Sequence, residues 1–225
     1  MRLSLNPKLP AMLVFIALAT LGTRGLAGDA AVKIVLIGDS YLASFGVEPG
    51  KSFGVQLQTA LDAAKVAVHI VDTGYTETSV SGARRIDERM SEPNGLGAAG
   101  PKAVILELGQ NDCGAHPLLD TSASLDRLLA RLAEGGIPVL VVGTTPYDHC
   151  ERKTRPNYNA LYVQMFADLA EKYGDLYYRD FKDGVNGHPE LMQGDHDHPT
   201  AEGDTVIVAR MLPVVQELVA RATQP

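Results

Sequence analysis

Short apolar runs alternate with amphipathic segments along most of the chain. Five runs rich in Val, Ile, Leu and Tyr have the composition of buried strands, and they predict strands at residues 32–37, 66–71, 103–108, 138–142 and 176–178. Between and after them, apolar residues recur at the spacing of one helix face, which predicts helices at residues 53–65, 118–134, 158–173 and 200–222. Strands and helices therefore alternate.

This alternation predicts an α/β fold. Nearly continuous apolar strands are buried on both faces, so we expect a three-layer α/β/α sandwich whose central sheet has about five parallel strands. No internal repeat or linker divides the chain, which favours a single globular domain. Ligands of such sheets bind outside the carboxyl ends of the strands, so the residues that follow the strands are the first candidates for function.

The apolar run at residues 11–21 has different surroundings. Arg2 and Lys8 precede it, and small residues follow it up to Ala27. This layout is typical of a secretory signal peptide, so we expect residues 1–27 to be removed and residues 28–225 to form the mature domain. The alternative is a membrane anchor, but the run has about half of the ~20 residues that a spanning helix needs. We expect an exported protein, periplasmic or secreted, with no stable membrane insertion after cleavage.

The chain is acidic. It has 20 Lys and Arg residues against 27 Asp and Glu residues, a net charge of −7 at pH 7. Removal of residues 1–27 takes away three basic side chains and no acidic one, which leaves a net charge of −10. Such a surface repels phosphate backbones, so nucleic acid is not expected as a partner.

Both cysteines, Cys113 and Cys150, remain after cleavage and meet an oxidising compartment. They follow the third and fourth predicted strands, which are neighbours in a plausible strand order. We expect a disulfide between them, and the alternative is a pair of buried free thiols.

Polar residues capable of chemistry follow several predicted strands. A Gly-Asp-Ser sequence ending at Ser40 follows the first strand, Asn111 follows the third, and Asp195 and His198 lie three residues apart before the last helix. A serine hydroxyl becomes a nucleophile when a base lies within hydrogen-bond reach and a third group orients that base. Ser40, His198 and Asp195 supply such a set. The Ser40 N–H and the Asn111 amide are candidate donors to an oxyanion.

Ser52 is a competing nucleophile because residues 50–54 read Gly-Lys-Ser-Phe-Gly, the string of α/β-hydrolase nucleophile elbows. That elbow needs a strand directly before the serine, whereas Pro49 and Gly50 break any strand here. Serine is common at a helix N-cap, so we predict that Ser52 begins the helix that follows and that Ser40 is the nucleophile.

Residues 195–198, Asp-His-Asp-His, also suit a metal ion. A closed zinc site draws four ligands, and no matching Cys/His cluster with recognisable spacing lies elsewhere in the sequence. We therefore expect neither a metal nor another cofactor, and we interpret His196 and Asp197 as solvated or supporting groups.

In this order and at these strand ends, the residues resemble the SGNH, or GDSL, hydrolase family. Within it the chain is most similar to small secreted esterases that include thioesterase I, lysophospholipase and arylesterase enzymes. The resemblance covers nearly all of residues 28–225 and rests on "IVLIGDSYLASFGV", "AVILELGQNDCGA", "IPVLVVG", "LAEKYG" and "HPTAEG". It implies a flavodoxin-like SGNH hydrolase fold.

The resemblance also implies roles for single residues. Ser40 matches the nucleophile, Asn111 the oxyanion asparagine, and Asp195 and His198 the terminal Asp-x-x-His pair. The glycine block after the second strand departs from the family pattern, because Glu77 falls where the second glycine of the oxyanion hole belongs. Either the Glu77 backbone N–H or that of Gly74 is then expected to be the remaining donor.

The sequence therefore predicts a serine esterase without a cofactor. The resemblance implies acyl, aryl or lysophospholipid esters as small-molecule substrates, with thioesters as a further possibility. Two alternatives stay open: a carbohydrate O-acetylesterase or acyltransferase on the same site, and a non-catalytic binding protein with the same fold.

Overall fold

The computed structural model describes residues 31–75, 79, 101–147, 150 and 157–224. The expected signal peptide, residues 1–27, lies outside the described residues. The elements follow the predicted alternation, in the order β1 (Val32–Gly38), η1 (Pro49–Lys51), α1 (Phe53–Ala63), β2 (Val68–Tyr75), β3 (Ala103–Glu107), α3 (Asp112–Ala115), α4 (Leu118–Glu134), β4 (Val139–Val142), α5 (Tyr158–Tyr173), β5 (Leu176–Tyr178), η3 (Pro189–Leu191) and α6 (Ala201–Ala222). Among the described helices, none combines the length and apolar character needed to cross a bilayer.

The five strands form one parallel sheet in the order β2-β1-β3-β4-β5. This is the flavodoxin-like order, in which the chain reverses direction across the sheet between β1 and β3. All five predicted strands are present. The carboxyl ends of β1, β3, β4 and β5 therefore share one edge of the sheet, and their loops are brought together.

The second strand extends further along the chain than predicted. It pairs with β1 from Val68 opposite Val32 to Tyr75 opposite Gly38, with a shift in register near the end. Residues 72–74 read Asp-Thr-Gly, which is typical of a turn, but Asp72 and Tyr75 pair with β1 on either side of the register shift and keep this stretch within the strand. Long-range pairing thus overrides local preference at this edge strand.

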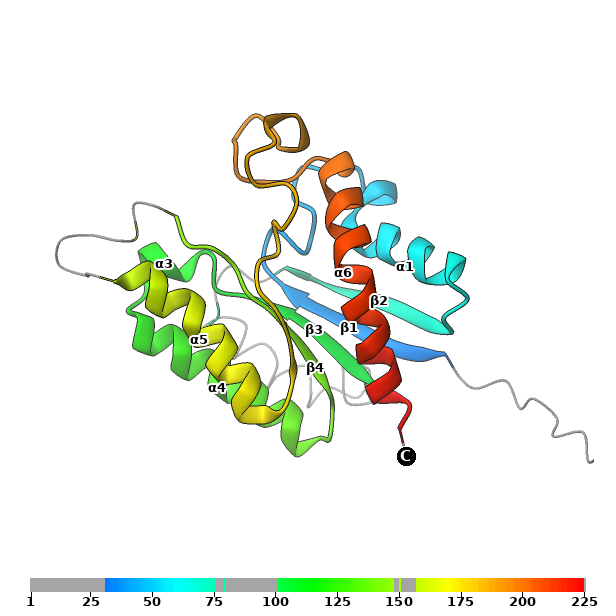
Figure 1. Ribbon diagram of the computed structural model, residues 1–225, viewed down its shortest axis with the longest axis horizontal. Coiled ribbons are helices and arrows are strands. Elements are labelled where there is room, and N and C mark those ends of the chain that lie inside the picture. Colours follow the sequence, from blue (N-terminus) through cyan, green and yellow to red (C-terminus); the bar gives the residue numbers. More distant parts are fainter. Residues whose placement is uncertain (1–30, 76–78, 80–100, 148–149, 151–156, 225) are drawn as a thin grey trace, which may run out of the picture.

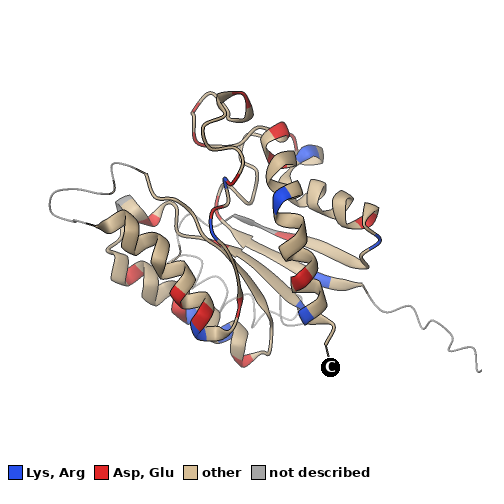
Figure 2. Cartoon of the chain, in the orientation of Figure 1, with Lys and Arg blue, Asp and Glu red and all other residues tan. Residues whose placement is uncertain are grey.

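Helices cover both faces of the sheet (Figure 1). Alternate side chains of β1 point to opposite faces, so Ile34 and Leu36 pack with α1 and α6 whereas Val35 and Ile37 pack with α4 and α5. The α5 aromatics Tyr158, Tyr162 and Phe166 are buried on this second face and form part of the core. Figure 2 shows Lys and Arg interspersed with Asp and Glu on the helices of both layers.

Helix α1 begins as predicted, with Ser52 at its N-cap position. The Ser52 side chain accepts no capping hydrogen bond within the described part of the chain. Instead, the Phe53 N–H donates to the Ser44 hydroxyl at 2.6 Å, and this hydroxyl donates to Asp204 at 2.7 Å. Ser44 thus joins the start of α1 to the first turn of α6.

We expect Asp204 to make folding stability depend on pH. Burial raises the pKa of Asp204 to about 7, well above its usual value of 3.8. The folded chain therefore keeps a proton that the unfolded chain has lost, and stability falls as the pH rises from about 4 to 7. In Asp204→Asn this loss is absent. Between pH 5 and 8 the unfolding free energy of wild type is therefore expected to fall by about 3 kcal/mol more than that of the variant. Urea unfolding of both proteins measures it, and parallel pH profiles would contradict it.

Candidate active site

Ser40 lies in a tight turn directly after β1. Gly38 permits this turn, because a Cβ there would lie 2.5 Å from the Leu42 Cβ and 3.0 Å from the Glu107 carbonyl oxygen. The Asp39 N–H donates to that carbonyl at 3.1 Å, and the Asp39 carboxylate accepts the Tyr41 N–H at 3.0 Å. The chain then turns back on itself, and the Phe45 N–H donates to the Ser40 carbonyl at 2.9 Å. Ser40 is therefore held at the carboxyl edge of the sheet.

The structure brings Ser40, His198 and Asp195 together. His198 Nε2 lies 2.9 Å from Ser40 Oγ, and His198 Nδ1 lies 2.7 Å from Asp195 Oδ2. Asp195 Oδ1 accepts the backbone N–H groups of Asp197 at 3.0 Å and His198 at 3.1 Å. Hydrogen bonds from the Asp197 N–H and from His198 lower the pKa of Asp195 to about 2. An ionised Asp195 favours the tautomer in which Nδ1–H donates to it and Nε2 accepts the Ser40 proton.

The loop that carries Asp195 and His198 is closed by its own backbone. Met192 and Pro199 form an antiparallel bridge, and the Gln193 N–H donates to the His198 carbonyl at 2.8 Å. The Gln193 amide also donates to the Phe45 carbonyl at 2.6 Å, across to the turn that carries Ser40. The loop before α6 is thus held against the loop after β1.

Asn111 is exposed at the start of the short helix α3, after β3. The chain enters α3 through Gly109, whose φ of +133° only glycine adopts readily. Its carbonyl accepts the Tyr162 hydroxyl. Gly74, one of the two residues considered for the remaining oxyanion donor, lies in β2, and Glu77 lies outside the described residues.

Asp112 is a structural residue that the sequence analysis did not single out. Its buried carboxylate accepts the Ser79 N–H at 2.8 Å and the Ser79 hydroxyl at 2.5 Å. It therefore holds Ser79 next to the start of α3. Its position directly after Asn111, in the sequence Gly-Gln-Asn-Asp, is the only sequence signal that points to it.

Two buried acidic side chains, Asp39 and Glu107, lie next to the turn that carries Ser40. The Asp39 N–H lies 3.3 Å from Glu107 Oε2, and both side chains are fully buried. Burial and mutual repulsion raise the pKa of Glu107, and burial also raises that of Asp39. A proton retained by the pair therefore avoids two adjacent buried charges under Ser40.

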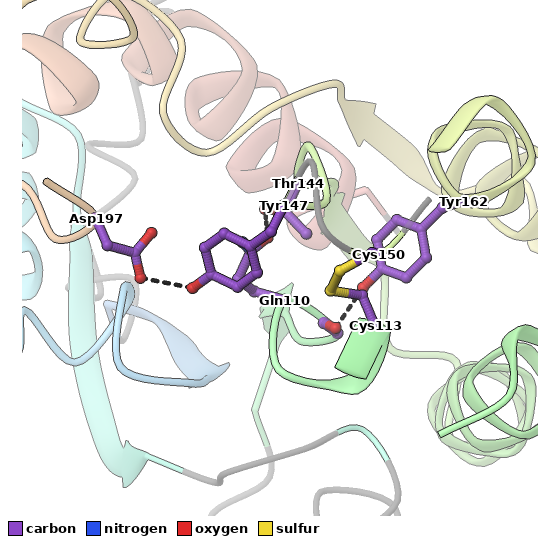
Figure 3. The surroundings of a disulfide bond; sticks show 8 residues. Gln110, Cys113, Thr144, Tyr147, Cys150, Tyr162 and Asp197 are labelled. Atoms are coloured by element: carbon purple, nitrogen blue, oxygen red, sulfur yellow. Dashed lines mark hydrogen bonds between the residues drawn. A yellow bond between two sulfur atoms is a disulfide. The ribbon is translucent and has the colours of Figure 1, made fainter. Parts of the chain in front are cut away.

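The structure contains the expected disulfide. Cys113 in α3 and Cys150 after β4 are bonded, with their Cα atoms 5.5 Å apart and both side chains buried (Figure 3). Since β3 and β4 are neighbours in the sheet, the bond joins two adjacent loops at its carboxyl edge. It connects the helix that begins beside Asn111 to the loop that carries Tyr147.

Asp197 lies at the centre of a polar cluster that the sequence analysis missed. Its carboxylate accepts the hydroxyl of Tyr41, the hydroxyl of Tyr147 at 2.6 Å and the ammonium of Lys182 at 3.2 Å. These four residues, the Asp197 cluster, come from loops that only the fold brings together. The sequence predicts a solvated or supporting group at Asp197, and its contacts show a supporting group.

Phe45 is an exposed aromatic residue beside His198. Its side chain is 60% exposed, and its ring centroid lies 5.2 Å from that of His198. An apolar face this close to the catalytic candidates provides a contact for an apolar ligand.

Comparison with known proteins gives a family match and a curated relative. The model of the GDSL-like Lipase/Acylhydrolase family matches residues 36–206, from β1 into α6. Among curated proteins, Esterase TesA of Pseudomonas aeruginosa is 25% identical over 201 residues, which cover 84% of this chain and 90% of TesA.

Two solved structures illustrate the similarity of fold. The psychrotrophic esterase EstA from Pseudoalteromonas sp. has a TM-score of 0.73 at 21% identity, over 84% of this chain and 99% of EstA. AlinE4, described as an SGNH-hydrolase family esterase, has a TM-score of 0.65 at 28% identity, over 87% of this chain and 98% of AlinE4. The α/β architecture with a five-stranded parallel sheet is thus that of the SGNH hydrolases.

Proposed function

The chain belongs to the GDSL-like lipase/acylhydrolase family, and on that premise we propose that it is a serine esterase with Ser40 as nucleophile, His198 as base and Asp195 as the partner of His198. The observation that carries the proposal is the continuous hydrogen-bonded chain from Ser40 Oγ through the His198 ring to Asp195. Each distance is within the 2.6–3.2 Å range of a working nucleophile and base.

Acylation begins when Ser40 Oγ attacks the ester carbonyl carbon and His198 Nε2 takes the hydroxyl proton. Asp195, ionised and hydrogen-bonded to Nδ1, stabilises the resulting imidazolium. Collapse of the tetrahedral intermediate breaks the bond to the leaving oxygen, which takes the proton from Nε2. Water activated by the same nitrogen then hydrolyses the acyl-enzyme and returns Ser40.

The oxyanion of each intermediate needs backbone or amide donors. Within the part of the chain that the structure describes, the Ser40 N–H has no hydrogen-bond acceptor, which leaves it free for this role. The exposed Asn111 amide, at the start of α3, is the second proposed donor. The third is the backbone N–H of Gly74 or Glu77. Each such donor is worth about 3 kcal/mol of transition-state stabilisation.

We propose small acyl, aryl or lysophospholipid esters as the substrates, with thioesters as a further class. The exposed ring of Phe45 beside His198 supports an apolar acyl or aryl group. The related proteins TesA and AlinE4 are both described as esterases, which supports a carboxylic ester as the reacting group.

Phe45→Ala is expected to raise KM for p-nitrophenyl octanoate about tenfold and to leave KM for the acetate within about twofold. The reason is that a long acyl chain loses roughly 1.4 kcal/mol of apolar contact, whereas an acetyl group does not reach the ring. Steady-state kinetics with both esters measures the change. Leu161→Ala is the matched control, because Leu161 is 55% exposed on α5. Equal KM values for wild type and Phe45→Ala would exclude Phe45 from the acyl site.

A fluorophosphonate probe tests the proposed nucleophile directly. The probe phosphonylates an activated serine with loss of fluoride, so we expect one label per chain, on the peptide that contains Ser40. Mass spectrometry of the digested protein locates the label. A label on Ser52, or none on folded protein that hydrolyses esters, would contradict the proposal.

We also propose that residues 1–27 direct export and are removed. The basic start, the apolar run and the small residues before Gly28 support this, as does the disulfide, which persists in an oxidising compartment. Expression of the full chain in a bacterium with a periplasm is expected to give a mature protein that begins at Gly28. Intact mass determination measures it, and retention of the N-terminus in exported protein would exclude cleavage.

A further inference from the structure

Four loops at the carboxyl edge of the sheet meet at Asp197. Tyr41 follows β1, Tyr147 follows β4, Lys182 follows β5, and Asp197 precedes α6. The Lys182 ammonium bridges two members, since it donates to the Tyr41 hydroxyl at 3.0 Å and to Asp197 Oδ1 at 3.2 Å. Three donors therefore converge on one carboxylate.

The cluster is largely removed from solvent. The side chains of Lys182 and Asp197 are 11% and 22% exposed, and Tyr41 is buried. Although burial opposes ionisation, hydrogen bonds from Tyr147 and Tyr41 and the charge of Lys182 hold the pKa of Asp197 below its usual value. Burial raises the pKa of both phenols, so they keep the protons that they donate.

Asp197 is covalently part of the loop that carries Asp195 and His198. Its N–H donates to Asp195 Oδ1 at 3.0 Å, while its side chain holds the Tyr41 hydroxyl. The Tyr41 ring in turn packs edge-on against the His198 ring, with centroids 5.4 Å apart. Asp197 thus fixes the backbone around His198 through its N–H, and through its carboxylate it holds the Tyr41 ring against which the His198 ring packs.

On the other side, the cluster reaches the disulfide-bonded loop. Figure 3 shows the Tyr147 ring extending from this loop to Asp197. The Tyr147 carbonyl accepts the Cys150 N–H at 2.9 Å, and Cys150 is bonded to Cys113 in α3. A continuous path of short contacts therefore joins the loop of His198 to the helix that begins beside Asn111.

We propose that Asp197 is a positioning residue that sets His198 relative to Ser40. The inference rests on the proposed serine esterase function. A buried ion pair by itself contributes little to stability, because desolvation offsets the attraction. Convergence of three donors from three other loops on a residue between Asp195 and His198 instead fixes geometry, and small errors in the geometry of reacting groups are costly in rate.

The test compares Asp197→Asn with wild type at a temperature where circular dichroism shows both proteins folded. We expect kcat for p-nitrophenyl acetate to fall about ten- to a hundredfold with KM within about twofold. The rate of Ser40 phosphonylation by a fluorophosphonate falls by a similar factor, because that reaction also needs His198 in place. Unchanged kcat and unchanged labelling would overturn the proposal.

Tyr147→Phe separates position from charge. It removes one tether and leaves the charge of Asp197 in place, so a several-fold lower kcat in this variant identifies a loss of position. If Asp197→Asn does not fold, the kcat and the labelling rate of Tyr147→Phe test the positioning role in its place. Wild-type kcat and labelling in Tyr147→Phe would count against the proposal.

Asp183→Asn is the matched control. Asp183 also accepts a tyrosine hydroxyl, that of Tyr178 at 2.9 Å, and a cation, Arg210 at 2.8 and 3.0 Å, but it does not lie on the loop of His198. Its kcat is expected to equal that of wild type. Ser40→Ala distinguishes the two levels of inference. If Ser40→Ala is active, the proposed function fails, and if it is inactive while Asp197→Asn equals wild type, only the positioning role fails.

Discussion

Ser40→Ala is expected to lower kcat for p-nitrophenyl acetate by a factor on the order of 10⁶, to the level of the reaction supported by binding and oxyanion donors alone. The substitution removes the proposed attacking atom, while the hydrogen bond between His198 and Asp195 is retained. The side chain of Ser40 lies at a half-buried surface position and carries no core packing, so the unfolding free energy should change by less than about 0.5 kcal/mol.

Ser52→Ala is the control for this prediction. Ser52 lies in the Gly-Lys-Ser-Phe-Gly string, but a 3-10 helix, not a strand, precedes it, and it stands at the N-cap position of α1. Its kcat is expected to match that of wild type. Activity that survives in Ser40→Ala and is lost in Ser52→Ala would reverse the assignment. Loss in both would indicate that one substitution disturbs the fold, which circular dichroism of the two variants detects.

The architecture follows from the hydrophobic pattern because each strand is buried on both faces. The runs at residues 32–37 and 103–108 contain the interior of β1 and β3, and helices α4 and α5 match their predicted bounds at 118–134 and 158–173. The end of β2 was not predictable, because Asp72 to Gly74 favour a turn. They stay within the strand only because Asp72 and Tyr75 pair with β1 on either side of the register shift.

The approach of Ser40, Asp195 and His198 was also predictable in outline. In a parallel sheet, the residues after successive strands meet at one edge, so a serine after the first strand and an Asp-x-x-His before the last helix converge. The disulfide followed from the same reasoning, because Cys113 and Cys150 follow neighbouring strands.

The residues that support the site could not be predicted, because they lie far apart in the sequence and follow no recognisable spacing. Lys182 and Tyr41 are 141 positions apart. A lysine is usually exposed and a tyrosine is often part of a core, so neither residue type indicates this contact. Glu107 ends an apolar strand, but nothing near it in the sequence indicates that it is buried against Asp39. Only the order of the strands and the lengths of the loops decide which of these groups meet.

Asp195→Asn is expected to lower kcat about 10³- to 10⁴-fold with KM nearly unchanged. Asparagine keeps the size of the side chain and one oxygen that accepts the N–H groups of Asp197 and His198, so the loop is expected to keep its shape. What changes is the group that faces His198 Nδ1. An amide nitrogen there favours the tautomer that carries its proton on Nε2, which then has no lone pair to accept the proton of Ser40.

A neutral oxygen facing Nδ1 would preserve the tautomer but still remove the charge that stabilises the imidazolium. Asp195 is 44% exposed, so water compensates part of that loss, and the expected effect is smaller than that of Ser40→Ala. Kinetics of Asp195→Asn beside Asp183→Asn measures the difference. A kcat within tenfold of wild type would mean that Ser40 and His198 act as a pair and that Asp195 serves chiefly to shape the loop through its backbone hydrogen bonds.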